Sequence, residues 1–130
     1  MAVTLRTLEA AFRQAWGADT TCLQPSSLTR WHHNTPEYGQ CGPTALVLQD
    51  LLGGDLLIAD VVGRDEADQV HYWNRLSSGL EIDLTGEQFT ADHMVGPPRV
   101  VVRPADGPRA YRQEYELLRA RVLSALQLSD

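Results

Sequence analysis

The chain has no lysine and no excess of positive charge. Its 11 basic residues are all arginines and stand against 17 acidic residues, which gives a formal net charge of −6 at pH 7. The arginines do not cluster either, since those from Arg99 to Arg121 are spread over an expected strand and an expected helix. Because generic binding to nucleic acid needs a basic surface, this composition argues against a nucleic-acid partner.

Long hydrophobic runs are also missing. The longest apolar stretches, such as Leu56–Ala59, are far too short to span a bilayer. The residues that follow Met1 lead into an amphipathic pattern without the apolar core of a signal peptide. We therefore expect no membrane partner and a cytoplasmic location. In that compartment the two cysteines, Cys22 and Cys41, are expected to be free thiols.

The closely spaced Cys-x-x-Cys or His-x-x-x-His pairs of strong zinc signatures are absent from the sequence. A zinc site built from His32, His33, His71 and a cysteine is the alternative that remains. We expect no metal and no other cofactor. His33 is expected instead to lie on the loop that approaches Cys41 and to line a pocket there.

Helices are indicated by the spacing of apolar residues. A chain of 130 residues that is 43% hydrophobic suits one domain with one core. Helical spacing covers Leu5–Trp16 and recurs from Tyr111 to Leu126, in a helix expected to begin near Pro108. Another helix is expected to start at Gly42-Pro43 and to end at Gly53-Gly54.

Strands are expected from apolar and alternating runs at residues 56–62, 69–75, 80–85 and 99–103. The second and third strands flank the turn Ser77-Ser78-Gly79 and read as a hairpin. Residues 18–40 are rich in Thr, Ser, Pro and Asn and are expected to form a long loop, a feature that is often functional. The sequence thus predicts one α+β domain over residues 1–130, with a mostly antiparallel sheet and a closing helix.

Cys41 stands at the expected start of the second helix, next to Gly42-Pro43. A thiol attacks as its thiolate, and the unpaired N–H groups and positive dipole end of a helix N-terminus stabilise that negative charge. The same N–H groups can receive the oxyanion that forms on an attacked carbonyl, and the adjacent Gln40 is a candidate for a further donor. The alternative is that Cys41 is a small buried apolar residue.

The hairpin supplies a histidine and a carboxylate. Depending on how the turn counts Gly79, His71 lies opposite Asp83, or opposite Thr85 with Asp83 on the diagonal. Both registers put His71 and Asp83 on one face, because side chains alternate with period two. An aspartate in that position holds the tautomer and orientation of an imidazole, as the third member of a catalytic triad does.

Two neighbours of His71 are candidates for the same site. Trp73 shares the face of Asp83 and would shield the pair from water, although a core aromatic residue is the plainer interpretation. Asn74 falls on the opposite face of a regular strand, which favours Asp83 as the residue that orients His71.

A cysteine at a helix start, followed by a histidine and an aspartate on neighbouring antiparallel strands, resembles the order of papain-like and transglutaminase-like folds. The more specific resemblance is to the YunG-like family of small bacterial proteins. It rests on motifs between Trp31 and Phe89, namely Trp31, Pro36, Gly39-Gln40-Cys41, Thr44-Ala45-Leu46, Gly53-Gly54, His71-Tyr72-Trp73-Asn74, Ile82-Asp83-Leu84-Thr85 and Gln88-Phe89.

The resemblance implies a papain-like (cysteine-proteinase-like) domain that carries Cys41, His71 and Asp83. Papain-type proteases have an oxyanion glutamine several residues before the cysteine, and Asn34 and Thr35 occupy that region here. The oxyanion donor is therefore open between Gln40 and other groups, and His33, Asn34 and Trp73 are the remaining candidates for contact with a substrate.

The expected function is a thiol-dependent hydrolase or acyltransferase that acts on an amide, isopeptide or thioester carbonyl. The short chain leaves little room for an extended peptide cleft, so the expected substrate is a small molecule or a protein side chain. A tailoring enzyme of a small-molecule pathway would fit. The alternatives are a non-catalytic binding module on the same fold, or a glutamine deamidase or toxin-like effector that uses the same triad.

Overall fold

The computed structural model describes residues 4–21, 36, 39–62, 69–85, 94–105, 107–108 and 111–127. Within them the chain is α+β, as predicted. The elements are α1 (Leu5–Ala15), the 3₁₀ turn η1 (Ala18–Thr20), α2 (Cys41–Leu52), β1 (Asp55–Val62), β2 (Gln69–Arg75), β3 (Glu81–Ile82), β4 (Met94–Val95), β5 (Arg99–Val101) and α3 (Arg112–Leu126).

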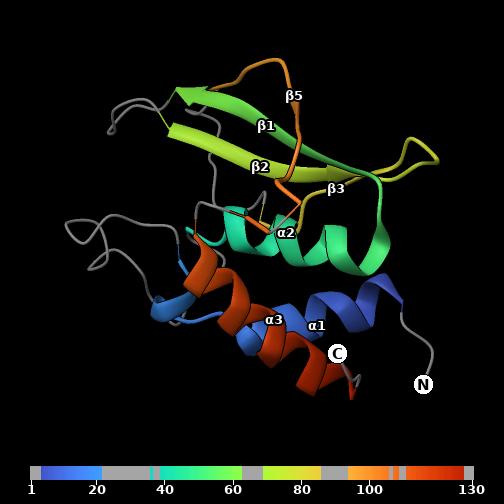
Figure 1. Ribbon diagram of the computed structural model, residues 1–130, viewed down its shortest axis with the longest axis vertical. Helices are drawn as coiled ribbons and strands as arrows, with labels where there is room; N and C mark the ends of the chain where they lie inside the picture. The colour runs from blue at the N-terminus through green and yellow to red at the C-terminus, as the bar shows by residue number, and fades with distance from the viewer. Residues whose placement is uncertain are drawn as a thin grey trace.

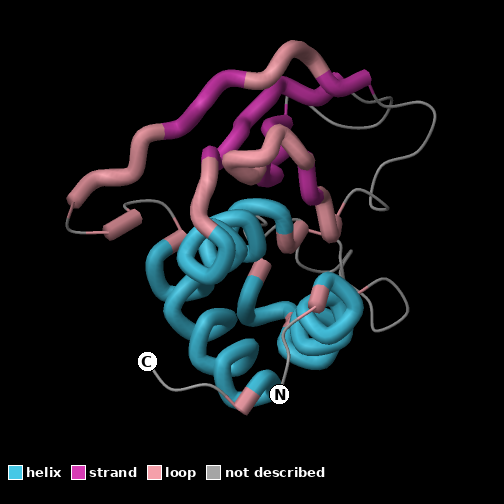
Figure 2. Tube along the Cα trace, turned by 90° about the vertical axis from the view of Figure 1, so that its right-hand side faces the viewer, coloured by secondary structure: helices cyan, strands magenta, loops and turns pink. Residues whose placement is uncertain are grey.

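These elements form layers, with α2 between the sheet on one side and the pair α1 and α3 on the other (Figure 1). In the view turned by 90° the strands again lie together at one end and the helices at the other (Figure 2). The three helices meet in the main hydrophobic core, which includes Leu8, Phe12, Val47, Leu48, Leu118 and Val122. No helix among the described residues is long and apolar enough to cross a membrane.

The sheet is antiparallel throughout its described pairings, in the order β3-β2-β1-β4, with β5 also paired to β1. Strands β4 and β5 lie along the edge of β1 that β2 leaves open. Between β4 and β5, the three residues 96–98 lie opposite two residues of β1, Ala59 and Asp60. The segment from β4 to β5 therefore carries one extra residue relative to β1. Pro97 and Pro98 fall at this bulge, where a missing backbone N–H removes no ladder hydrogen bond.

Three expectations about element bounds need correction. The strand expected at residues 80–85 is only Glu81–Ile82, because the chain turns at Leu84 and Thr85. The strand expected at 99–103 ends at Val101, and the closing helix begins at Arg112 instead of near Pro108. The short strand β4 was not predicted.

The two faces of the sheet have different surroundings. On β2, the Asn74 side-chain amide donates a hydrogen bond of 2.9 Å to the Ala45 carbonyl of α2, so the face that carries Asn74 and Tyr72 packs against this helix. The other face carries Leu57, Ala59 and Trp73, which form a separate buried cluster. Because β1 and β2 pair regularly from Asp55–Arg75 to Val61–Gln69, their side chains stay divided between these two faces.

Gly54 joins α2 to β1 in a conformation that only glycine adopts easily. Its φ is +79°, and a Cβ added there would lie 2.4 Å from the Arg75 carbonyl oxygen. Gly79, in the hairpin turn, also has a positive φ, of +93°, but a Cβ there would meet nothing within 4 Å. A comparison of Gly79 with Gly54 therefore separates the free-energy cost of a strained φ from that of a steric clash.

We expect Gly79→Ala to lower the free energy of unfolding by about 1–2 kcal/mol, the cost of a left-handed conformation for an L-residue. Gly54→Ala should cost clearly more, because the strand β2 must also move away from the new methyl group. Urea unfolding of both variants measures the difference. Equal losses would show that the close approach of Gly54 to Arg75 is not maintained in solution.

Candidate functional site

His71 and Asp83 are in direct contact. The His71 Nε2 atom lies 2.6 Å from Asp83 Oδ2, with the two side chains 2% and 34% exposed. The pairing of Asn74 with Ile82 and of Arg75 with Glu81 selects the second predicted register, in which Asp83 lies on the diagonal. A buried imidazole thus reaches a carboxylate that is open to solvent.

Trp73 covers the same site. Its ring stacks on His71 with centroids 5.5 Å apart and an interplanar angle of 19°. The indole Nε1 donates a 2.7 Å hydrogen bond to Glu81 Oε1, which fixes the plane of the ring. Trp73 therefore covers one face of the imidazole and also belongs to the buried cluster with Leu57 and Ala59. The role of Glu81 was not predicted from the sequence, although its place opposite Arg75, on the face of Trp73, was the available signal.

Cys41 is the first residue of α2 and is 5% exposed. Pro43 lies in the first turn of the same helix, as predicted. Because His71 stacks on Trp73 and Asn74 binds α2, His71 lies on the face of the sheet opposite to the one that packs against α2. The described ladder between β2 and β3 joins Asn74 to Ile82 and Arg75 to Glu81 and does not extend to residues 71–73.

Gln40 has a structural role that differs from the expected one. The residue is fully buried, its Oε1 accepts a 2.7 Å hydrogen bond from the Thr20 hydroxyl, and its Nε2 donates a 2.9 Å bond to the Gly17 carbonyl. These bonds tie the start of α2 to the turn after α1. The Nε2 atom carries a second N–H, and the role of Gln40 as an oxyanion donor stays a prediction.

Several candidate residues lie outside the described part of the chain. These are His33 and Asn34, expected to contact a substrate, together with Cys22 and His32. The described residues contain no group of three or more His, Cys, Asp or Glu side chains that could hold a metal ion.

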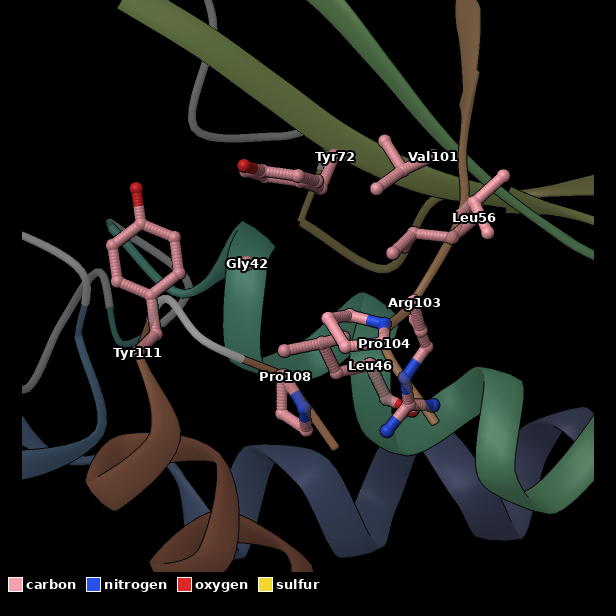
Figure 3. Close-up of a pocket in the computed structure, with 10 residues that line it drawn as sticks. Gly42, Leu46, Leu56, Tyr72, Val101, Arg103, Pro104, Pro108 and Tyr111 are labelled. Carbon is pink, nitrogen blue, oxygen red and sulfur yellow. The ribbon is translucent and has the colours of Figure 1, made fainter. Parts of the chain in front are cut away.

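A pocket of about 90 Å³ opens beside the first turn of α2 (Figure 3). Its walls come from α2, the paired strands and the segment before α3, and include Gly42, Leu46, Leu56, Tyr72, Val101 and Tyr111. The rings of Tyr72 and Tyr111 stand on either side of Gly42 at 6.2 Å and 84° to each other. Sequence reasoning missed this pocket because its walls are distant in the chain.

Arg103 holds one wall of this pocket in place. Its guanidinium donates a 2.7 Å hydrogen bond to Asp50 of α2 and lies 5.4 Å from the centre of the Tyr115 ring on α3. The Tyr115 hydroxyl donates a short hydrogen bond to the other Asp50 oxygen. Burial of the phenol, together with its bond to the Asp50 carboxylate, raises the pKa of Tyr115 above the usual 10.0.

Comparison with known proteins identifies the family to which this sequence is similar. The family model described as "YunG protein" matches residues 4–127. A curated relative named "Uncharacterized protein YunG", from Bacillus subtilis (strain 168), is 42% identical over 65 residues, which cover 50% of this chain and 51% of the relative. The matched part thus spans about half the length of that relative. No solved structure shows a significant match to the chain.

The Asp50–Tyr115 contact has a spectroscopic signature. We expect Tyr115 to ionise above pH 10.0, and Asp50→Asn to lower its pKa because the nearby carboxylate is removed. Absorbance titration of the phenolate, read as the difference from Tyr115→Phe, isolates this residue. Because folding favours the neutral phenol, its contribution to stability should be complete below pH 10.0 and disappear as the pH rises through the raised pKa. A Tyr115 titration that Asp50→Asn leaves unmoved would contradict the contact.

Proposed function

The chain belongs to the YunG family, and we propose that it acts as a thiol-dependent hydrolase or acyltransferase on an amide, isopeptide or thioester carbonyl. Cys41 is the nucleophile, His71 the general base and acid, and Asp83 the group that orients His71. The fold that accompanies this proposal is papain-like, with Cys41 at the start of a helix, His71 on β2 and Asp83 directly after β3. The substrate is a small molecule or a protein side chain.

The contact between His71 and Asp83 carries the proposal. At 2.6 Å from Nε2, the carboxylate fixes the ring plane and selects the tautomer with its proton on this nitrogen. Nδ1 is then the nitrogen that exchanges a proton with the substrate and the thiol. Trp73 limits the access of water to one face of the ring, which strengthens this interaction.

The proposed reaction has two balanced steps. In the first, the thiol proton passes to His71, the sulfur–carbon bond forms, and the bond from the carbonyl carbon to the leaving group breaks as that group takes the proton. In the second, water or another acceptor attacks the thioester, the sulfur–carbon bond breaks, and the proton removed from the acceptor returns to sulfur through His71. No redox partner is needed.

The first turn of α2 supports the oxyanion. The first turn of α2 presents backbone N–H groups at the positive end of the helix, where the Thr44 N–H donates to the Gln40 carbonyl at 3.1 Å. These groups and the helix dipole favour negative charge at this point. The Gln40 side chain, whose amide is bonded to Thr20 and Gly17, is the further candidate donor.

A second candidate function follows from the two faces of the sheet. His71 and α2 lie on opposite faces, which favours a non-catalytic binding module in which Asp83, Trp73 and His71 contact a partner. In that case Cys41 is a packing residue. The reactivity of the thiol separates the two functions.

We expect an activated thiolate at Cys41. In the single-cysteine variant Cys22→Ser, alkylation by iodoacetamide should already be fast at pH 6–7, because the helix N-terminus and His71 stabilise the thiolate. The added variant His71→Ala should move the midpoint of the rate–pH profile upward, toward the value of about 8.5 for a free cysteine, with the helix N-terminus as the remaining stabilising group. Intact-mass spectrometry follows both reactions.

The variant Cys41→Ser, which leaves only Cys22, is the matched control and should keep the melting temperature of the wild type. If Cys41 reacts only near pH 8.5, with or without His71, the catalytic assignment is lost and the binding module stands.

Asp83→Asn should preserve the fold and misorient His71. With p-nitrophenyl acetate as the probe, we expect the rate of Cys41 acylation to fall on the order of 10²–10⁴-fold. Asp60→Asn, the same change at a carboxylate that is 71% exposed, is the control and should leave the rate unaltered. Equal rates for the two variants would remove Asp83 from the mechanism.

A further inference from the structure

We infer that the pocket beside Gly42 binds a short, neutral, apolar acyl group of the substrate. The inference rests on the proposed function, because it gives that function a substrate class. It uses residues that the sequence patterns did not connect, from α2, β1, β2, β5 and the segment before α3.

The size and lining of the pocket favour a small aliphatic group. Leu46, Leu56 and Val101 line it with aliphatic side chains, and Tyr72 contributes a ring (Figure 3). Its volume of about 90 Å³ is below the roughly 150 Å³ of a cavity that accommodates benzene. A linear or branched chain of about four carbons fits this space, whereas a longer acyl chain would extend beyond it.

Charge favours a neutral ligand. The cation at the pocket, Arg103, turns its guanidinium toward α2, where it bonds to Asp50 at 2.7 Å and to Gln49 and the Leu46 carbonyl at 3.4 Å each (Figure 3). Its aliphatic stem is what remains to line the pocket. A carboxylate ligand would therefore have to compete with Asp50 for this guanidinium.

The pocket wall is held by a strained residue. Tyr111 has a φ of +59°, in the left-handed region, which costs about 1–2 kcal/mol for a residue with a side chain. This conformation sets the Tyr111 ring over Gly42, where an added Cβ would lie 2.9 Å from a ring carbon. Strain of this kind persists where the surroundings enforce it and is concentrated at ligand-binding sites.

The pocket adjoins the proposed nucleophile, on the face of the sheet that carries Tyr72. Gly42 lines the pocket and directly follows the proposed nucleophile, and its N–H is one of the proposed oxyanion donors. An acyl chain inserted beside Gly42 would thus hold its carbonyl at the first turn of α2. Binding in this orientation prepays the entropy of placing the two reacting groups together.

The test measures binding without requiring a reaction. Cys41→Ser protein is titrated with N-methylacetamide, N-methylbutanamide and N-methylhexanamide, and binding is followed by NMR chemical shifts. Affinity should rise roughly fourfold for each added methylene that enters the pocket, and should stop rising beyond about four carbons, in keeping with the small volume.

Two neighbouring residues of β5 provide matched variants. Val101 lines the pocket, whereas Val100 pairs with Leu57, points to the other face and is 52% exposed. Val101→Trp should fill the pocket and weaken N-methylbutanamide binding at least tenfold, while Val100→Trp should leave it unchanged. Val101→Phe provides a smaller obstruction if the Trp variant melts early. Equal behaviour of the Val101 and Val100 variants, or an affinity independent of chain length, would overturn the inference.

A second measurement keeps this result separate from the proposed function. The wild type is treated with p-nitrophenyl acetate, butyrate and octanoate; Cys41 sulfur gains the acyl group and p-nitrophenolate leaves. Butyrate should react fastest, and Val101→Trp should suppress butyrate more than acetate. Amide binding without any acylation would remove the proposed function and keep the pocket. Acylation at equal rates for all three esters would keep the nucleophile and remove the acyl pocket.

Discussion

The position of α2 constrains the rest of the molecule. This helix lies between the sheet and the α1–α3 pair, so its residues from Cys41 to Leu48 are all buried and apolar contacts surround it. Its few polar groups are matched individually: the Ala45 carbonyl accepts from Asn74, and the Thr44 hydroxyl accepts from the Trp16 indole at 2.9 Å. A residue at the start of this helix is consequently held inside the protein, near the dipole end and away from bulk water. That placement is the physical basis both for a reactive Cys41 thiolate and for a Cys41 that only packs in the core.

The hairpin decides what the histidine can do. Its register brings Asp83 to His71 and, by the same period of two, sends Asn74 to α2. The alternation of side chains along β2 therefore both brings His71 to Asp83 and separates the imidazole from α2. A catalytic role requires the Cys41 thiol and the His71 imidazole to come together. The proposed binding module has no such requirement.

Local signals in the sequence predicted most of the elements. Gly53-Gly54 ends α2, residues 69–75 form β2 with the expected bounds, and the two hairpin registers included the observed one. Strand β4 was missed because two residues carry no periodicity. The bonds of Gln40 to Thr20 and Gly17, and the Arg103–Asp50–Tyr115 cluster, were missed because the partners are 12 to 65 positions apart, with no pattern that links them. The pair His71 and Asp83 was predictable because a hairpin turns a long-range contact into a local one.

The bulge at Pro97-Pro98 affects whether the sheets of separate molecules can pair edge to edge. The outer side of the sheet exposes Val95, Val100 and Val102, which would suit the addition of a foreign strand. Two successive residues without an N–H stand in the middle of that border, and the extra residue there shifts the register between Met94–Val95 and Arg99–Val101. An added strand would lack two backbone N–H donors at the prolines. It could not keep one hydrogen-bonding register along both Met94–Val95 and Arg99–Val101. The same kink that lets one segment follow β1 therefore discourages the sheets of separate molecules from fusing at high concentration.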